Sequence, residues 1–196
     1  MTRASTRGAP LVLASGSQVR RQMLESAGLA LTVSVSDVDE RPIAGEDEPA
    51  RARRLAIAKA RAVSLRHPGS VVVGADQVGF LDDGRALEKP RDAEHARAQL
   101  VAMRGRAHSF VSCAAVVRDG EVRAVVEERA TVRFRAFSDD ELTAHVARGE
   151  WKGSCGGYQI EHAGVGFVAE IAGSYHAILG LPLVPLLAAL RTEGVS

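Results

Sequence analysis

The stretch from Leu11 to Arg21 reads L-V-L-A-S-G-S-Q-V-R-R and joins an apolar strand to an amphipathic helix through a short polar loop. Backbone N–H groups at a helix start and the positive end of the helix dipole favour an anion, and Arg20 or Arg21 can add bidentate contacts to a phosphate. Ser17 is equally compatible with a plain helix N-cap. The stretch therefore predicts an α/β arrangement and a candidate phosphate-binding turn, and the rest of the chain must decide its role.

Composition and charge indicate a globular protein without a global charge bias. The 196 residues are 46% hydrophobic and 4% aromatic, and 25 Lys and Arg offset 24 Asp and Glu to a formal net charge of +1. This balance disfavours nucleic acid and membranes as partners, so any anion site must be local. The two cysteines lack a metal-ligand spacing, and no apolar run is long enough to span a bilayer or act as a signal peptide. We expect a cytoplasmic protein.

Strands and helices are expected to alternate along most of the chain. The patterns predict strands over 31–36, 70–81, 107–117, 122–137 and 165–171, and helices over 18–28, 50–66, 92–105, 138–149 and 182–191. The turns D-D-G-R (82–85) and R-D-G-E (118–121) predict antiparallel hairpins. We therefore predict one domain over residues 1–196, with residues 1–9 as a flexible tail. Its fold is α/β, with a mixed, partly antiparallel twisted sheet flanked by helices and two lobes around a cleft.

The helix over 50–66 is expected to bury one apolar stripe. Leu55, Ala58, Ala62 and Leu65 recur at helical spacing and define that stripe. Lys59 lies in the same helix and by itself reads as an exposed helix residue.

Three further charged residues are candidates for chemistry. Asp76 interrupts the apolar run V-V-V-G-A-D-Q-V-G-F, so its carboxylate needs a cation, a metal or a catalytic role, with a structural pair to an arginine as the alternative. Lys89 precedes Pro90 in a loop and offers a compact ammonium for phosphate, or else is a solvated surface lysine. Glu40 ends the acidic D-V-D-E run. Its carboxylate could bind a hard divalent cation; alternatively, the run is an acidic loop that faces solvent.

Several motifs together resemble the Maf-like nucleoside triphosphate pyrophosphatases. They run in the family's order from residue 11 to residue 190: L-A-S-G-S-Q-V-R-R-Q-M-L, D-V-D-E, L-A-I-A-K-A-R, G-A-D-Q-V, L-E-K-P, C-G-G-Y-Q-I-E and G-S-Y-H-A-I-L-G-L-P-L. Each motif is modest alone, but their joint order is specific. The resemblance implies a small enzyme, usually a homodimer, that binds a nucleoside triphosphate in its cleft and hydrolyses it to the monophosphate and pyrophosphate with Mg or Mn. House-cleaning of non-standard nucleotides is the implied role.

The resemblance also implies roles for individual residues. Asp76 corresponds to the proton acceptor that activates water, and Lys89 joins it as a catalytic residue that neutralises charge on the leaving pyrophosphate. Ser15, Arg20 and Lys59 correspond to substrate-binding positions. Glu40 would help to bind the metal; alternatively, Glu40 and Asp76 both ligate it and the metal generates hydroxide.

Three positions track the choice of base within the resembled family, namely Val19, Gln77 and Glu161. Gln77 and Glu161 match the subgroup that prefers 7-methyl-GTP, where a carboxylate can balance a cationic methylated guanine. Val19 stands where that subgroup has tryptophan, and the G-S-Y-H motif (173–176) is more similar to the dTTP and UTP subgroup. A dTTP/UTP-preferring pyrophosphatase therefore stays open, as does a nonenzymatic nucleotide-binding regulator of cell division.

Overall fold

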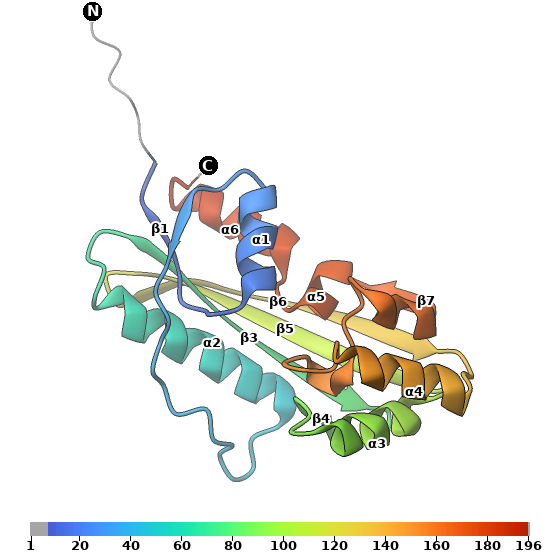
Figure 1. Cartoon of the computed structure of the whole chain (residues 1–196). Helices are drawn as coiled ribbons and strands as arrows, with labels where there is room; N and C mark the ends of the chain where they lie inside the picture. Colours follow the sequence, from blue (N-terminus) through green and yellow to red (C-terminus); the bar gives the residue numbers. More distant parts are fainter. Residues whose placement is uncertain (1–7, 196) are drawn as a thin grey trace, which may run out of the picture. The chain divides into compact units, whose positions relative to one another are not determined.

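A computed structural model describes residues 8–195 of the chain (Figure 1). Within that range the chain forms two compact units. The first comprises residues 8–76, 112–127 and 180–195, and the second comprises residues 77–111 and 128–179. Three long strands pass from one unit into the other, because the unit boundaries fall inside β3 (Val71–Leu81), β5 (Ala107–Arg118) and β6 (Glu121–Phe134).

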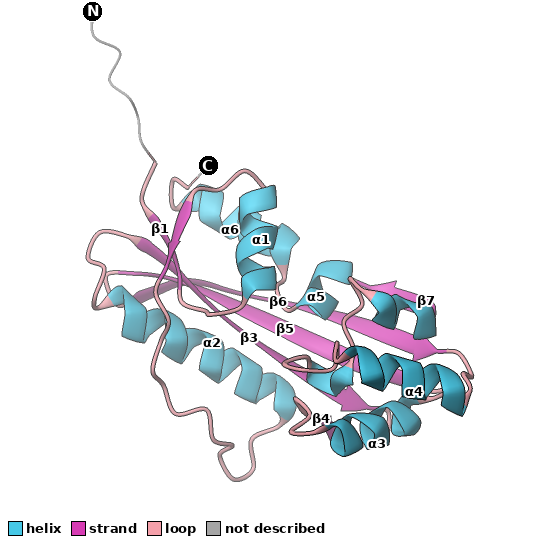
Figure 2. Ribbon diagram, viewed as in Figure 1, coloured by secondary structure: helices cyan, strands magenta, loops and turns pink. Residues whose placement is uncertain are grey.

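The described strands form one open mixed sheet of seven strands, which confirms the predicted fold class (Figure 2). The order is β2-β1-β3-β5-β6-β7, and β4 (Ala86–Leu87) pairs with β3. The strand β1 (Leu11–Leu13) is parallel both to β2 (Leu31–Val33) and to β3, whereas β4 and β7 (Val168–Gly173) are antiparallel to their neighbours. The hairpin predicted at 118–121 is present, since Asp119 and Gly120 both adopt positive φ angles of 51° and 82°, as a type I′ turn requires.

The first unit contains the helices α1 (Gln18–Ser26), α2 (Glu48–Ser64) and α6 (Leu183–Thr192). The buried residues of α2 include the small residues Ala52, Ala56, Ala60 and Ser64, together with Leu55, Lys59 and Val63. The predicted apolar stripe is therefore wrong outside Leu55. Leu65 is 79% exposed, because the buried face runs through Ala52, Ala56 and Ala60 and does not include residue 65. Small side chains let the helix backbone approach β3 closely.

The second unit contains α3 (Ala93–Met103), α4 (Asp139–Arg148) and α5 (Tyr175–Leu179) around an aromatic core. Phe134, Phe137, Tyr158 and Phe167 pack in edge-on and tilted pairs. Buried His108 lies among them, with its Nε2 atom 2.7 Å from the Tyr158 hydroxyl oxygen. Burial lowers the pKa of His108 to about 4, so this imidazole is a neutral structural group at pH 7.

Two predictions near the carboxyl end of the chain need correction. Residues Ala163–Phe167 form a 3-10 helix, so the expected strand over 165–171 begins only at Val168 and continues to Gly173. The A-G-S-Y-H segment is not an open turn, because Tyr175 starts the short helix α5 directly after the strand. Glycine at 173 permits this abrupt change, since it combines a φ of 95° with a position where a Cβ atom would lie 2.4 Å from the Arg129 carbonyl oxygen.

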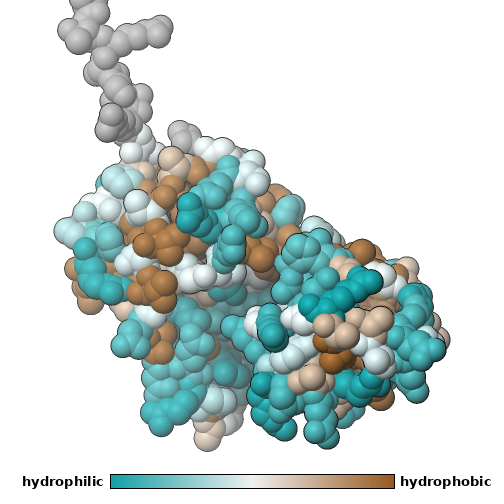
Figure 3. All heavy atoms as spheres, in the orientation of Figure 1, coloured by the Kyte–Doolittle hydropathy of each residue, from teal (hydrophilic) through white to brown (hydrophobic). Residues whose placement is uncertain are grey.

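Several predictions about the ends and the whole of the chain are not tested. Most of the tail expected over residues 1–9 lies outside the described residues, although the Ala9 amide donates to the Gly194 carbonyl. The single domain over 1–196 and the cleft stay predictions. Within residues 8–195, every helix is too short or too polar to cross a bilayer. Hydrophilic and hydrophobic residues are interspersed over the face shown in Figure 3.

Candidate active site

The centre of the candidate site is an ammonium group between two carboxylates. The Lys59 Nζ atom lies 2.7 Å from Asp76 Oδ1 and 2.8 Å from Glu40 Oε1. The Lys59 and Asp76 side chains are only 10% and 14% exposed, whereas that of Glu40 is 59% exposed. Lys59, Asp76 and Glu40, which the sequence analysis named as separate candidates, thus lie at one place in the fold. The prediction that Lys59 is an exposed helix residue is wrong. The alternative that Asp76 pairs with an arginine is also wrong, because its ion-pair partner is Lys59.

Close packing of α2 on β3 places this lysine. A Cβ atom on Gly74 would lie 2.2 Å from the Ala56 carbonyl oxygen and 2.5 Å from the Ala60 nitrogen, so only glycine fits there. Lys59 precedes Ala60 on this contact face, and Asp76 lies two residues after Gly74 on the strand. Because side chains two residues apart share one face of a strand, Gly74 and Asp76 both face the helix. The glycine thereby sets the distance that the lysine has to span.

The turn between β1 and α1 carries Ser15 and Arg20. The Arg20 guanidinium donates through Nη1 to the Ser15 hydroxyl at 3.2 Å and to the Ala75 carbonyl at 2.8 Å, and through Nε to the Gly180 carbonyl at 2.8 Å. Burial lowers the pKa of Arg20, whereas the negative charges of Asp76 and Glu40 raise it. The Ala75 and Gly180 carbonyls therefore orient the Arg20 side chain. Its electrostatic interaction with Asp76 and Glu40 shows that it lies near the two carboxylates that contact Lys59.

Ser17 is the N-cap of α1, which confirms the prediction that it is compatible with a plain helix N-cap. Its hydroxyl accepts from the Arg20 amide at 3.4 Å. Ser15, rather than Ser17, contacts the arginine side chain. Val19 lies half-exposed in the first turn of this helix.

Glu40 and Asp76 are the residues that could hold a divalent cation. Their oxygens converge on one Nζ atom, so they already share one cationic centre, and carboxylate oxygens suit Mg²⁺ or Mn²⁺. No cluster of three or more His, Cys, Asp or Glu suited to a metal occurs within residues 8–195. The donor set therefore fits an ion that takes one or two protein carboxylates and completes its shell with phosphate and water, as Mg²⁺ commonly does.

Two backbone carbonyls of the second unit hold the side-chain amide of Gln77 in place. The Nε2 atom donates to the carbonyl oxygens of Ala177 and Ile178 at 2.8 and 2.7 Å. Since both partners can only accept, the amide nitrogen must face them. The Oε1 atom is then the polar group that Gln77 retains for another contact, and it can only accept a hydrogen bond.

Lys89 and Glu161 are both exposed residues of the second unit. The loop that carries Lys89 is anchored on both sides, because the Glu88 amide donates to Gln99 Oε1, the Gly156 amide donates to the Glu88 carbonyl, and Pro90 is buried. Within the described residues, no hydrogen bond or ion pair involves the Lys89 ammonium. Such a lysine remains available to an incoming anion.

Comparisons with known proteins place the chain in a family. The family model described as "Maf-like protein" matches residues 10–193. The chain belongs to this family. It is 42% identical over 192 residues to a nucleoside triphosphate pyrophosphatase of Nitrobacter hamburgensis, with 95% of each chain covered.

Other relatives of this Maf-like chain differ in the substrate for which they are named. A 7-methyl-GTP pyrophosphatase of Mesorhizobium japonicum is 42% identical over 192 residues, covering 94% of this chain and 96% of that protein. A dTTP/UTP pyrophosphatase of Symbiobacterium thermophilum is 37% identical over 173 residues, covering 88% of each. The likeness is similar in all three cases and so leaves the base undecided.

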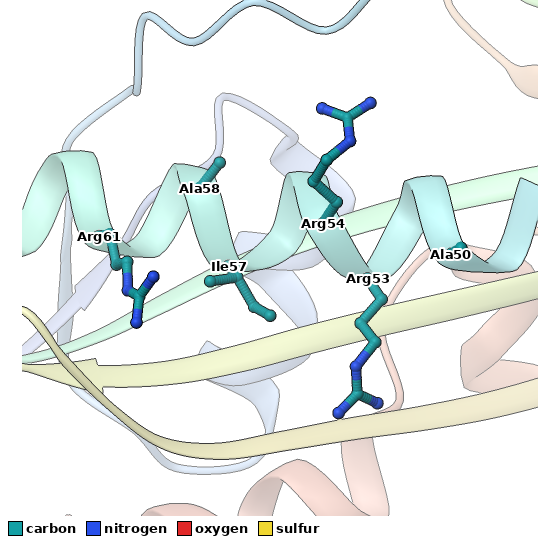
Figure 4. Close-up of a pocket in the computed structure, with 6 residues that line it drawn as sticks. All are labelled: Ala50, Arg53, Arg54, Ile57, Ala58 and Arg61. Carbon is teal, nitrogen blue, oxygen red and sulfur yellow. The ribbon is translucent and has the colours of Figure 1, made fainter. Parts of the chain in front are cut away.

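Some contacts of this Maf-like site were not foreseen from the sequence. Tyr175 lies in the G-S-Y-H motif, but its proximity to Glu161 emerges only from the fold: burial raises the pKa of the Tyr175 hydroxyl, and the Glu161 charge adds to the rise. The Ala75 and Gly180 carbonyls that hold Arg20 carry no side-chain signal. A separate groove of about 530 Å³ lies along α2, lined by Ala50, Arg53, Arg54, Ile57, Ala58 and Arg61, and contains none of the predicted site residues (Figure 4).

Proposed function

We propose that this protein hydrolyses a nucleoside triphosphate to the nucleoside monophosphate and pyrophosphate. The observation that carries the proposal is the Lys59 ammonium within 2.7 and 2.8 Å of the Asp76 and Glu40 carboxylates, with Arg20 electrostatically coupled to both. This arrangement combines a base with cations that can bind a polyphosphate. The names of the Maf-like relatives support the same reaction class.

In the proposed reaction Asp76 accepts a proton from water as the water oxygen attacks the α-phosphorus. The bond from the α-phosphorus to the bridging oxygen breaks, and that oxygen leaves with pyrophosphate. Lys59 keeps the Asp76 carboxylate oriented through the 2.7 Å ion pair between the two side chains. Arg20, Ser15 and Lys89 bind phosphate oxygens and offset the charge that develops on the leaving group.

A divalent cation is part of the proposal. Mg²⁺ or Mn²⁺ bound by Glu40, with or without Asp76, would neutralise phosphate charge and lower the pKa of a bound water. Lys59 occupies the point between both carboxylates in the described structure, so Glu40 must exchange part of its ion pair to bind the metal. Its 59% exposed side chain has room for that movement.

For the base we propose 7-methylguanine, so that the substrate is 7-methyl-GTP. Gln77 offers an acceptor to the N–H donors of a guanine edge, and Glu161 offers a carboxylate to a cationic ring. Tyr175, which is 42% exposed and electrostatically coupled to Glu161, can supply the aromatic contact that Val19 cannot. The dTTP/UTP alternative is favoured by the G-S-Y-H motif, and Gln77 can accept equally from the single N–H of a pyrimidine.

The deciding experiment measures pyrophosphate release from 7-methyl-GTP, GTP, dTTP and UTP with Mg²⁺, with Mn²⁺ and with a chelator. We expect metal-dependent turnover that is fastest with 7-methyl-GTP, as for an enzyme that removes non-standard nucleotides in the cytoplasm. Tight binding without product would favour the nonenzymatic regulator instead. Absence of turnover with every standard and modified triphosphate, in the presence of either metal, would refute the enzyme.

A further inference from the structure

The loop that carries Glu40 lies between β2 and α2. Residues 34–47, all of which the structure describes, form neither helix nor strand. A segment of this kind is more mobile than the elements that it connects, unless contacts from other segments hold it. A carboxylate that binds a metal needs its oxygens in a narrow range of positions. Contacts that fix the backbone at Glu40 therefore bear on the proposed reaction.

The first turns of α2 provide two such contacts. Arg51 donates through Nη2 to the Glu40 carbonyl oxygen at 3.2 Å. Arg54, one helical turn later, donates through Nη2 to the Arg41 carbonyl oxygen, also at 3.2 Å. The same helix carries Lys59, whose ammonium contacts Glu40 Oε1. Helix α2 thus contacts Glu40 through its backbone as well as through its side chain.

A carboxylate near the end of the loop orients Arg54. The Nε and Nη2 atoms of Arg54 each lie 2.7 Å from one carboxylate oxygen of Glu46, so the ion pair is bidentate. The two side chains are only 29% and 12% exposed, which shields the pair from solvent. A bidentate pair fixes the plane of a guanidinium group. Glu46 therefore directs the remaining N–H of Arg54 Nη2 toward the Arg41 carbonyl.

Electrostatic interactions link this ion pair to the candidate site. The hydrogen bond from Arg54 lowers the pKa of the Glu46 carboxyl, so that group is ionised at pH 7. The same hydrogen bond raises the pKa of Arg54, and the negative charges of Asp39 and Asp76 add to the rise. Arg54 therefore lies within electrostatic range of Asp76 while its hydrogen bonds go to the loop.

The preceding arginine does not share these contacts. Figure 4 shows Arg54 directed to the opposite side of α2 from Arg53, Ile57 and Arg61. Within residues 8–195, the Arg53 side chain makes no hydrogen bond or ion pair. Two adjacent residues of the same type thus differ in one respect, because only Arg54 holds the loop.

We propose that Arg54, held by Glu46, is a positioning residue that keeps Glu40 in place for a divalent cation. Arg51 provides the second contact of this kind. The inference rests on the proposed function, in which Glu40 binds Mg²⁺ or Mn²⁺. When the Glu40 carboxylate moves from Lys59 to the metal, both arginines keep its backbone fixed, because they bind carbonyl groups rather than the carboxylate. The cation then binds a segment that is already ordered, which lowers the entropic cost of binding.

The variant Arg54→Met tests the proposal in the full-length protein with Mn²⁺ alone. Electron paramagnetic resonance of free Mn²⁺ gives the dissociation constant without nucleotide or turnover. We expect this constant to rise roughly tenfold, although loss of a positive charge by itself would tighten cation binding. The double variant Arg54→Met/Glu46→Gln leaves no unpaired carboxylate and should show the same rise. Arg53→Met makes the matched change one residue earlier and should not weaken Mn²⁺ binding.

Turnover provides a second readout. In Arg54→Met, the Mn²⁺ concentration for half-maximal pyrophosphate release should rise with the dissociation constant. The kcat at saturating Mn²⁺ should stay within about twofold, because Asp76 and Lys59 keep their contact. A purely structural role would lower kcat through loss of folded protein, which circular dichroism detects, and would leave the metal requirement unchanged.

The outcomes separate this inference from the proposed function. Wild-type Mn²⁺ affinity in Arg54→Met, or a fall in kcat with an unchanged metal requirement, would overturn the positioning role. Absence of Mn²⁺ binding by the wild-type protein would overturn it as well. A wild-type protein that binds Mn²⁺ but hydrolyses no triphosphate would instead contradict the proposed function, while weaker Mn²⁺ binding by Arg54→Met would still support the positioning role.

Discussion

The two units of this protein differ in how far the polar side chains of the candidate site are held by contacts within the chain. In the first unit, Lys59, Asp76 and Glu40 hold one another at hydrogen-bond distance, and backbone carbonyls fix Arg20. In the second unit, the polar pair at the centre, His108 and Tyr158, is fully internal to an aromatic core, whereas Lys89 and Glu161 stand exposed. For the proposed function, the difference means that the Lys59–Asp76–Glu40 group and Arg20 are held in place before substrate binds, whereas the Lys89 and Glu161 side chains are free to adjust to it.

The largest expected effect lies at the fixed charges. Asp76→Asn keeps the size of the side chain but removes its ability to accept a proton, so we expect turnover to fall by about 10²–10⁴-fold. Pyrophosphate release under saturating substrate measures this loss. The control Asp82→Asn removes an exposed carboxylate in the turn before β4 and should retain activity. Near-normal turnover of Asp76→Asn would show that Asp76 is not the base.

The packing that positions Lys59 can be disturbed without changing any charge. In Gly74→Ala, the new methyl group overlaps the Ala56 carbonyl and the Ala60 nitrogen, so α2 must move away from β3. We expect a loss of about 1–3 kcal/mol in the free energy of unfolding and a marked fall in turnover. Urea unfolding checks the stability. The matched variant Gly166→Ala places its methyl group in open space and should leave both quantities unchanged.

The buried imidazole of the second unit should make stability depend on pH. Its pKa is about 4 in the folded protein against 6.5 for an unperturbed histidine, so between these values the unfolded chain binds the proton and the folded chain does not. The contribution of His108 is therefore complete above pH 6.5 and is lost as the pH falls toward 4. From pH 7 to pH 5 we expect a loss of about 2 kcal/mol from this residue.

The variant His108→Phe isolates that contribution. It leaves the Tyr158 hydroxyl without its partner at every pH, so it lowers stability overall, but it should flatten the pH dependence between 7 and 5. Urea unfolding at both pH values gives the comparison. An unchanged slope would assign the acid sensitivity to other groups.

The smallest effect is expected at the exposed residues. Glu161→Gln removes a negative charge but keeps a hydrogen-bond acceptor, so the preference for 7-methyl-GTP over dTTP should fall on the order of tenfold. The ratio of kcat/KM for the two nucleotides is the relevant measurement. Glu170→Gln makes the same change on the exposed face of β7 and serves as the control. An unaltered ratio in Glu161→Gln would exclude this carboxylate from base selection.

Prediction from the sequence succeeded where the determining contacts are short-range. The helices expected from residues 92 and 138 begin where Asp92 and Ser138 cap α3 and α4, and the Asp119–Gly120 turn closes the expected hairpin as its residue types require. It failed at the α2 stripe, because helical spacing does not reveal that Gly74 demands small residues opposite it. It also failed at Val165, where an apolar residue lies in a 3-10 turn before the strand.

The candidate site shows the same division. Motif order sufficed to select Ser15, Arg20, Lys59 and Asp76, and the chemistry of each residue type indicated phosphate and proton transfer. Folding supplied the partners: Arg20 reaches carbonyls 55 and 160 positions away, and Gln77 reaches carbonyls 100 and 101 positions away. Caps and turns are specified within a few neighbouring residues, whereas the approach of α2 to β3 depends on backbone packing between distant segments. That packing makes Lys59, which alone resembles a solvated helix residue, the centre of the site.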